Sequence, residues 1–280
     1  MIKSCYNFND FENDDFWLHR YSSANHLEST FKSGNLNLRF STALNFEDPL
    51  EGWDFKDADV KNGMDGVVHY YNRVINAGGT VEYLSGALEL LTQSRTDKLK
   101  KIIKQLNKYS EKRSSTYISC WFKTDTLEEE NRAMWKLYGN NEDGVRVSVK
   151  WSDLKKELEK TEEEFEVGFI DYGNQKNTAN LYFIKDKSYS NENEFRILFS
   201  KENSNDLEFV KFENLNKLNC TTRSKHNLDC YNNRLKKLGF NDGNNSKLKL
   251  EKSNLLYESK QVNWEEVLGV LNNEIISRNL

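Results

Sequence analysis

The sequence predicts an α+β fold in which strands dominate and helices are inserted between them. Apolar and polar side chains alternate at residues 36–40 and 145–149, which is the period of a half-buried strand. Other segments carry helix-capping residues and apolar side chains at helical spacing. Because the strand and helix signals do not alternate regularly, a sheet wound from βαβ units is not expected. The 280 residues contain no linker-like stretch, so we predict a single α+β domain over residues 1–280.

The N-terminal elements are expected to follow one another closely. Residues 16–21 (FWLHRY) form a short apolar and aromatic strand. A helix is predicted over residues 25–32, with Asn25 as its N-cap and Gly34 at its C-terminal end. The alternating segment at 36–40 then forms the next strand.

The middle of the chain is predicted to contain an insertion, a buried strand and a capped helix. Residues 61–115 carry a helical apolar stripe and are interpreted as a helical insertion. The apolar run at 117–122 (YISCWF) predicts a buried strand. A helix is predicted over 126–138, beginning at the capping residue Thr126 and ending at Gly139.

The second half of the chain is predicted to add further strands. Residues 152–164 are charged and helical in pattern, and the segments at 167–172 and 194–199 are typical of strands. The remaining residues, 201–280, are treated as a C-terminal extension because their periodicity is weak. They end in an amphipathic helix that begins at Asn263.

Composition excludes several classes of protein. Aromatic residues make up 12% of the chain, which is too many for a disordered protein, and a net charge of −4 gives no broad basic face for non-specific binding of nucleic acid. The sequence contains no Walker A, GxGxxG, HExxH or GxSxG motif. It also has no long apolar run, a polar N-terminus and four cysteines without a CxxC pair, so we expect a cytoplasmic protein without a membrane partner.

The strongest chemical signal lies in the predicted strand near residue 194. The period of a strand places Glu192, Glu194 and Arg196 on one face, while the apolar residues between them face the core. Carboxylates in such surroundings have shifted pKa values, and a carboxylate can stabilise an oxocarbenium-like ribose cation during glycosyl transfer. The same residues on an exposed strand would instead form cross-strand ion pairs.

Two further groups of residues are candidates for a nucleotide site. Arg20 ends the first strand just before a predicted helix, where its planar guanidinium could hold a phosphate or could pair with a surface acid. Trp121, Trp135 and Tyr138 form an aromatic group that could stack on a base or a nicotinamide ring, or belong to the core.

Evidence for a metal site is weak. The only proline, Pro49, lies in a turn with Glu47, Asp48 and Glu51, but this spacing fits no EF-hand loop. A second group has the right residue types for zinc without a standard spacing or a fourth ligand. Its members are Cys220, His226 and Cys230.

Several segments taken together resemble a bacterial and phage family that is catalogued only as a domain of unknown function. The shared segments are an opening aromatic-Arg-Tyr strand at 17–21, an Asp-Pro-x-Glu-Gly turn at 48–52, Ser-Cys-Trp at 119–121, Met-Trp-x-Leu-Tyr at 134–138 and Glu-x-Glu-x-Arg at 192–196. Each segment is weak alone, but the combination is specific, and it spans roughly residues 16–200.

The order of these segments is in turn similar to ADP-ribosyltransferases of the Arg-Ser-Glu type. The resemblance implies an ADP-ribosyltransferase-like fold, with central antiparallel or mixed sheets and peripheral helices. It implies that Arg20 holds the phosphates or ribose of NAD and that Ser119 is the middle-strand residue. It also implies that Glu194 is the catalytic glutamate and that Glu192 orients the acceptor. Ser-Cys-Trp stands where those enzymes have Ser-Thr-Ser. Because the two residues after Ser119 depart from the pattern, the resemblance is weaker for the role of Ser119 than for the glutamates.

The resemblance therefore predicts an NAD-dependent ADP-ribosyltransferase that modifies a macromolecule, with RNA favoured over protein. A toxin or phage-defence role, with a neutralising antitoxin protein as partner, would fit this family context. The predicted NAD-binding residues are Arg20, Tyr21, Ser119, Trp121, Trp135, Tyr138 and Arg196. Two alternatives stay open: a non-catalytic nucleotide- or protein-binding module, and a metal-dependent nuclease using Glu47, Asp48 and Glu51.

Overall fold

The structure of the chain is a computed structural model. It describes residues 1–6, 15–46, 52, 108, 111–139, 143–173, 180–202, 205–213, 215, 218–223, 228–240 and 248–253.

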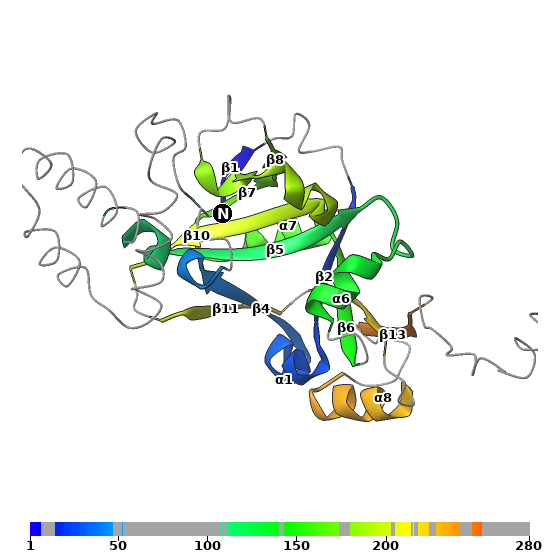
Figure 1. The fold of residues 1–280 in the computed structure, drawn as a ribbon. Helices are drawn as coiled ribbons and strands as arrows, with labels where there is room; N and C mark the ends of the chain where they lie inside the picture. Colours follow the sequence, from blue (N-terminus) through cyan, green and yellow to red (C-terminus); the bar gives the residue numbers. More distant parts are fainter. Residues whose placement is uncertain are drawn as a thin grey trace, which may run out of the picture.

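A mixed sheet of eleven strands organises the described residues (Figure 1). The outermost pairs, β1 with β7 and β12 with β13, are parallel, and the other pairs are antiparallel. This mixture agrees with the predicted α+β class. The main path runs through β1 (Ile2–Tyr6), β7 (Phe165–Phe169), β10 (Glu194–Ser200), β5 (Thr116–Thr124), β2 (Trp17–Ser23), β6 (Gly144–Lys150), β12 (Leu218–Thr222) and β13 (Leu248–Lys252).

The sheet forks along one edge of β5. Near its C-terminal end, β5 pairs with β2 through Phe122, Lys123 and Thr124. Near its N-terminal end, it pairs with β4 (Asn35–Thr42) through Tyr117 and Ile118. Residues 119–121 have no ladder partner on that edge within the described strands. Figure 1 shows β2 and β4 leaving β5 at different points and approaching each other again near α1.

Two further strands pair with β4. The strand β3 (Phe31–Lys32) forms a hairpin with the start of β4, and β11 (Leu207–Phe212) pairs with β4 along its other edge. A separate two-stranded sheet joins β8 (Asp171–Tyr172) to β9 (Ile184–Lys185).

Short helices connect the strands. The described α-helices are α1 (Leu27–Thr30), α6 (Arg132–Tyr138), α7 (Trp151–Leu158) and α8 (Leu228–Lys237). The 3-10 helices are η1 (Ala24–His26), η2 (Ala43–Asn45), η3 (Leu181–Phe183) and η4 (Lys187–Glu192). None of the helices in the described part of the chain is long and apolar enough to cross a bilayer.

The predicted strands are confirmed with one exception, and their alternation builds the core. The strand predicted at 167–172 is divided between β7 and β8, which belong to different sheets. On β4, Leu36, Leu38 and Phe40 are buried, and the residues between them are partly exposed. On β10, the three alternate residues Phe195, Ile197 and Phe199 enter the same core. The opposite face of β10 is therefore free to carry polar groups, as the period of two predicted.

The predicted helix over residues 25–32 is only partly correct. The α-helix ends at Thr30, and Ser23 caps the preceding turn, its hydroxyl accepting a hydrogen bond from the Asn25 amide at 3.4 Å. Gly34 does not end the helix. It has a φ of +72° and occupies the tight turn between β3 and β4, where glycine adopts such an angle without a steric penalty.

The predicted start of the helix over residues 126–138 is wrong. The helix begins at Arg132, and the Asn131 side chain caps it by accepting from the amides of Ala133 and Met134. The guanidinium of Arg146 donates hydrogen bonds to the carbonyls of Leu127 and Glu129, at 3.0 and 2.6 Å. Those carbonyls would be the acceptors of an earlier helical turn, so this tertiary contact overrides the local capping signal.

The C-terminal half supplies more of the sheet than its sequence pattern indicates. Strands β11, β12 and β13 come from the segment predicted as an extension, and Phe212, Leu218 and Cys220 lie in the main core. The predicted helix from Asn263 lies outside the described residues. Of the predicted insertion at 61–115, the structure describes Lys108 and residues 111–115, which are helical.

Candidate functional site

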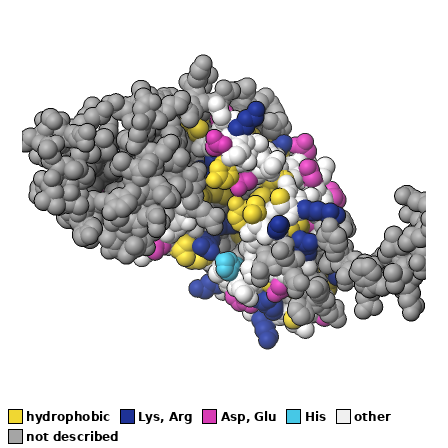
Figure 2. Space-filling view, viewed as in Figure 1, with side chains coloured by type: hydrophobic (Ala, Val, Ile, Leu, Met, Phe, Trp, Pro, Cys, Tyr) yellow, Lys and Arg dark blue, Asp and Glu magenta, His cyan; other side chains and the backbone are white. Residues whose placement is uncertain are grey.

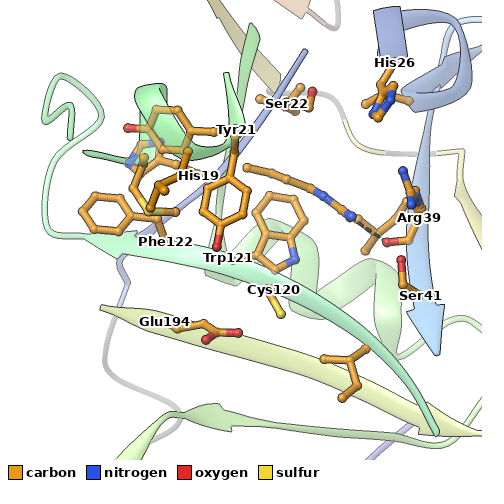
Figure 3. Close-up of a pocket in the computed structure, with 18 of the residues that line it drawn as sticks. His19, Tyr21, Ser22, His26, Arg39, Ser41, Cys120, Trp121, Phe122 and Glu194 are labelled. Carbon is orange, nitrogen blue, oxygen red and sulfur yellow. Dashed lines mark hydrogen bonds between the residues drawn. The ribbon is translucent and has the colours of Figure 1, made fainter. Parts of the chain in front are cut away.

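The fork in the sheet opens into a cleft of about 710 Å³, which we call the fork cleft. Strands β2, β4 and β5 line it, together with α6, η4, Lys185 of β9 and the first residue of β10. Figure 3 shows Glu194 and Cys120 on one side, Arg39, Ser41 and His26 across from them, and Tyr21 and Trp121 between. Figure 2, seen from the same side as Figure 1, shows hydrophobic side chains gathered near the middle of the molecule, with basic and acidic side chains around them.

Glu194 forms the acidic end of the fork cleft. Its side chain is buried, with Arg196 Nε at 2.7 Å from Oε1 and Lys185 Nζ at 2.8 Å from Oε2. Burial alone would raise the pKa of Glu194, but the two cations outweigh it and lower the pKa to about 2. Glu194 is therefore an ionised carboxylate at neutral pH, unsuited to donating a proton, and both its oxygens have cationic partners.

Lys185 links the two glutamates of the predicted motif. Its Nζ lies 2.7 Å from Glu192 Oε2 as well as 2.8 Å from Glu194 Oε2. Glu192 lies at the end of η4 and not on the strand, because Asn193 turns the chain with a φ of +37°. The Glu192 carboxylate also accepts from the Tyr138 hydroxyl at 3.4 Å. The structure therefore joins Glu192 to Glu194 through a lysine that the sequence did not identify, and Tyr138 joins the group through Glu192.

Arg196 lies behind Glu194 and does not line the cleft. Its guanidinium is fully buried and donates to the Tyr182 carbonyl at 2.5 Å as well as to both Glu194 oxygens. Its predicted place among the NAD-contacting residues is therefore not supported by its position. Arg196 is a positioning residue, which holds the Glu194 carboxylate in one orientation.

Cys120 is a further cleft residue that the sequence did not single out. Its thiol interacts with the Glu194 carboxylate from the neighbouring strand. Burial, reinforced by the Glu194 charge, raises the pKa of this thiol well above its ordinary value. Cys120 is consequently a neutral thiol at physiological pH and not a nucleophile.

Arg20 and Arg39 form the basic end of the fork cleft. Arg20 donates to the Ser119 hydroxyl at 2.9 Å and to the Arg39 carbonyl at 2.6 Å, so the structure brings the predicted Arg20 and Ser119 together. Ser119 is fully buried and does not line the cleft, so its position does not support direct contact with NAD. Burial lowers the pKa of Arg20 to about 10, which leaves it charged at neutral pH. Neither arginine contacts a carboxylate within the described part of the chain. The pair therefore presents uncompensated positive charge to an anion.

The predicted aromatic residues divide between the core and the cleft. Trp135 is fully buried, packs edge-to-face on Tyr21 with ring centroids 4.9 Å apart, and donates to Glu130. It does not line the cleft, so stacking against a ligand is not supported for it. Trp121, Tyr21 and Tyr138 do line the cleft, and Tyr138 is 46% exposed at its mouth. Trp121 is buried and also belongs to the main core. The Trp121 indole nitrogen is buried without a hydrogen-bond partner among the described residues.

His19 also lines the cleft but serves a structural purpose. Its ring nitrogens lie 2.7 Å from the Ser148 hydroxyl and 2.6 Å from the Thr124 hydroxyl. Burial, reinforced by the charge of Arg146, lowers the pKa of His19 to about 3. The ring is therefore neutral at physiological pH and joins β2 to β5 and β6 by hydrogen bonds.

We expect His19 to make the protein less stable as the medium becomes acidic. The folded protein binds fewer protons at His19 than the unfolded chain, whose histidine titrates near 6.5. The stability that neutral His19 contributes is full above pH 6.5 and falls as the pH drops toward 3. Urea unfolding of the His19→Gln variant should therefore show a flatter pH dependence than the wild type. The exposed His26→Gln variant is the control, and equal slopes in all three proteins would contradict the assignment.

The metal-site alternative gains no support from the described residues. They contain no group of three or more His, Cys, Asp or Glu side chains placed to hold a metal ion. Cys220 is buried in the core, and Cys230 is exposed on α8. Glu47, Asp48, Pro49, Glu51 and His226 lie outside the described residues.

Comparison of the chain with protein-family models, with curated proteins and with solved structures finds no match in any of the three. A functional assignment therefore has to be argued from the fork cleft itself.

Proposed function

We propose that this protein is an NAD-dependent ADP-ribosyltransferase that modifies a macromolecule, with RNA favoured over protein as the acceptor. One observation carries the proposal: Glu194 and Arg20 line the same cleft, and aromatic side chains lie between the acidic and basic ends. This arrangement suits a ligand with negative charge at one place and developing positive charge at another. NAD has both, in its pyrophosphate and in the ribose that loses nicotinamide.

The residues of the cleft divide the chemistry between them. Arg20 would hold the pyrophosphate, since a guanidinium matches phosphate oxygens and Arg20 has no competing carboxylate among the described residues. Glu194 would stabilise the ribosyl cation as the glycosidic bond breaks and its electron pair leaves with nicotinamide. An acceptor nucleophile then forms the new bond to the ribose carbon and loses its proton.

The acceptor would approach from the mouth of the cleft. Glu192 lies at this mouth beside Tyr138, and its carboxylate is ion-paired with Lys185 Nζ at 2.7 Å. A carboxylate in this place can orient an acceptor hydroxyl or amine and accept its proton. A toxin or phage-defence role and a neutralising antitoxin are parts of the same proposal, supported by the family resemblance.

A binding module without catalysis is the second candidate. Both oxygens of Glu194 already carry cationic partners, and ion-pair networks of this kind also occur in purely structural settings. Such a module would bind NAD or another nucleotide in the fork cleft and release no nicotinamide.

Labelled NAD distinguishes the two candidates. The protein is incubated with adenine-labelled NAD and cell extract, with and without RNase, and free nicotinamide is measured in parallel. A transferase transfers the label to RNA or to protein and releases one nicotinamide for each label transferred. Binding of NAD with neither nicotinamide release nor labelled product would overturn the transferase proposal and favour the module.

A further inference from the structure

A mixed aromatic and basic surface continues the fork cleft onto the neighbouring strand β11. The antiparallel register places Phe209 opposite Arg39, Leu207 opposite Ser41, and Lys211 opposite Asn37. Residues paired across two strands point to the same face of a sheet. The β4 members of these pairs line the fork cleft, so the β11 members extend its wall. We call these six residues the β4–β11 face: Asn37, Arg39, Ser41, Leu207, Phe209 and Lys211.

The two apolar side chains of the β4–β11 face, Phe209 and Leu207, are exposed to solvent. Phe209 is 41% exposed and Leu207 is 37% exposed, whereas Leu38 and Phe40 on the opposite face of β4 are buried in the core. A phenylalanine exposed on a strand gains little from folding, but it offers a flat ring to a ligand. Its register position directly opposite Arg39 puts the two side chains on the same face of the sheet.

The charges of the β4–β11 face favour an anion. Arg39 has no carboxylate partner among the described residues, and its Nε is buried without a hydrogen bond. Arg20 adds a second cation against the Arg39 carbonyl. Lys211 pairs with Glu213 at 2.7 Å, but the two side chains are 48% and 65% exposed, so the pair is weak and a phosphate can replace it.

We propose that the β4–β11 face binds single-stranded nucleic acid, and that this strand is the acceptor of the transferase proposed above. One base would stack on Phe209, and Arg39 and Lys211 would hold the adjoining phosphates. An aromatic side chain between cations on an open sheet face is the arrangement that binds unpaired bases. A duplex would meet the same cations, but its stacked bases could not reach the Phe209 ring. The face joins the fork cleft at its basic end, so the strand would continue from there toward Glu192 at the acidic end.

Fluorescence anisotropy without NAD tests this inference. The full chain is titrated into a labelled RNA strand of about twelve nucleotides, a DNA strand of the same sequence, and the corresponding duplexes. Either single strand should bind more tightly than its duplex, and the RNA and DNA arms show which sugar is preferred. The Phe209→Leu variant should bind the single strand about 5- to 100-fold more weakly, whereas Phe209→Tyr should retain binding.

The lysines provide a matched pair of variants. Lys211 and Lys249 are both exposed strand lysines that pair with the glutamate two residues later, but only Lys211 belongs to the β4–β11 face. The Lys211→Gln variant should reduce the dependence of log K on log salt by about 0.7, the value for one phosphate contact on a single strand. Lys249→Gln should leave it unchanged.

Several results would overturn the inference. These are wild-type affinity in Phe209→Leu, equal affinity for single strands and duplexes, and equal effects of the two lysine variants. Because binding is measured without NAD, the outcome is separate from that of the proposed function. Strand binding without NAD turnover would remove the transferase proposal and the acceptor role that rests on it, but would leave the binding face. Turnover without strand binding would leave the transferase proposal and remove the binding face.

Discussion

Replacing Glu194 with glutamine should abolish NAD turnover, with a loss on the order of 10²–10³-fold or more in rate. The glutamine keeps the shape of the side chain but lacks the negative charge that would stabilise the ribosyl cation. The Glu194→Asp variant keeps that charge, but its shorter side chain moves the carboxylate away from the ribose by one methylene. It should therefore also lose most of the turnover. Nicotinamide release measured at saturating NAD checks both variants.

The Glu194 variants need controls for stability, because this carboxylate is buried against two cations. The Glu194→Gln variant leaves Lys185 and Arg196 less well compensated, so we expect a lower melting temperature. Adding Lys185→Gln removes one of these cations and should recover part of the stability without recovering turnover. Glu157→Gln is the matched control, because Glu157 is also buried and ion-paired but lies away from the cleft. Full turnover in a folded Glu194→Gln protein would refute the catalytic assignment.

The sequence predicted the acidic end of the cleft only in part. The period of a strand correctly placed Glu194 and Arg196 on the face opposite the core, because burial of alternate residues determines that face. It could not predict Lys185, which lies on a two-residue strand in a different sheet and reaches Glu194 through tertiary structure. It also placed Glu192 on the strand, because nothing local indicates that Asn193 adopts a left-handed conformation.

The aromatic residues and the basic end show the same division between local and tertiary information. Helical spacing put Trp135 and Tyr138 on one face but could not separate them. Trp135 packs against the Tyr21 ring and is buried in the core, whereas Tyr138 stays exposed at the cleft mouth. Arg39 occupies a polar position of an alternating strand, so its place on the face away from the core was predictable. Its place opposite Arg20 depends on the fork in the sheet, where β2 and β4 pair with different parts of β5.

Replacing Arg196 with methionine should destabilise the fold by about 3–5 kcal/mol, the usual cost of removing one partner from a buried ion pair. The side chain is fully buried, and its loss also leaves the Tyr182 carbonyl without this donor. Urea unfolding should show the midpoint falling, whereas Lys3→Met, which removes one member of an exposed ion pair with Glu164, should cost about 1 kcal/mol or less. An unchanged midpoint in Arg196→Met would contradict the buried network.

A double variant separates the contribution of this ion pair to stability from its contribution to function. Arg196→Met combined with Glu194→Leu removes both members of the pair and leaves Lys185 with Glu192 as its partner. Apolar side chains of similar volume often replace a buried ion pair without loss of stability, so the double variant should recover much of the lost free energy of unfolding. It should nevertheless remain inactive toward NAD. A stable and inactive double variant would mean that the buried carboxylate and its guanidinium are retained for the chemistry of the cleft, since the fold does not require them.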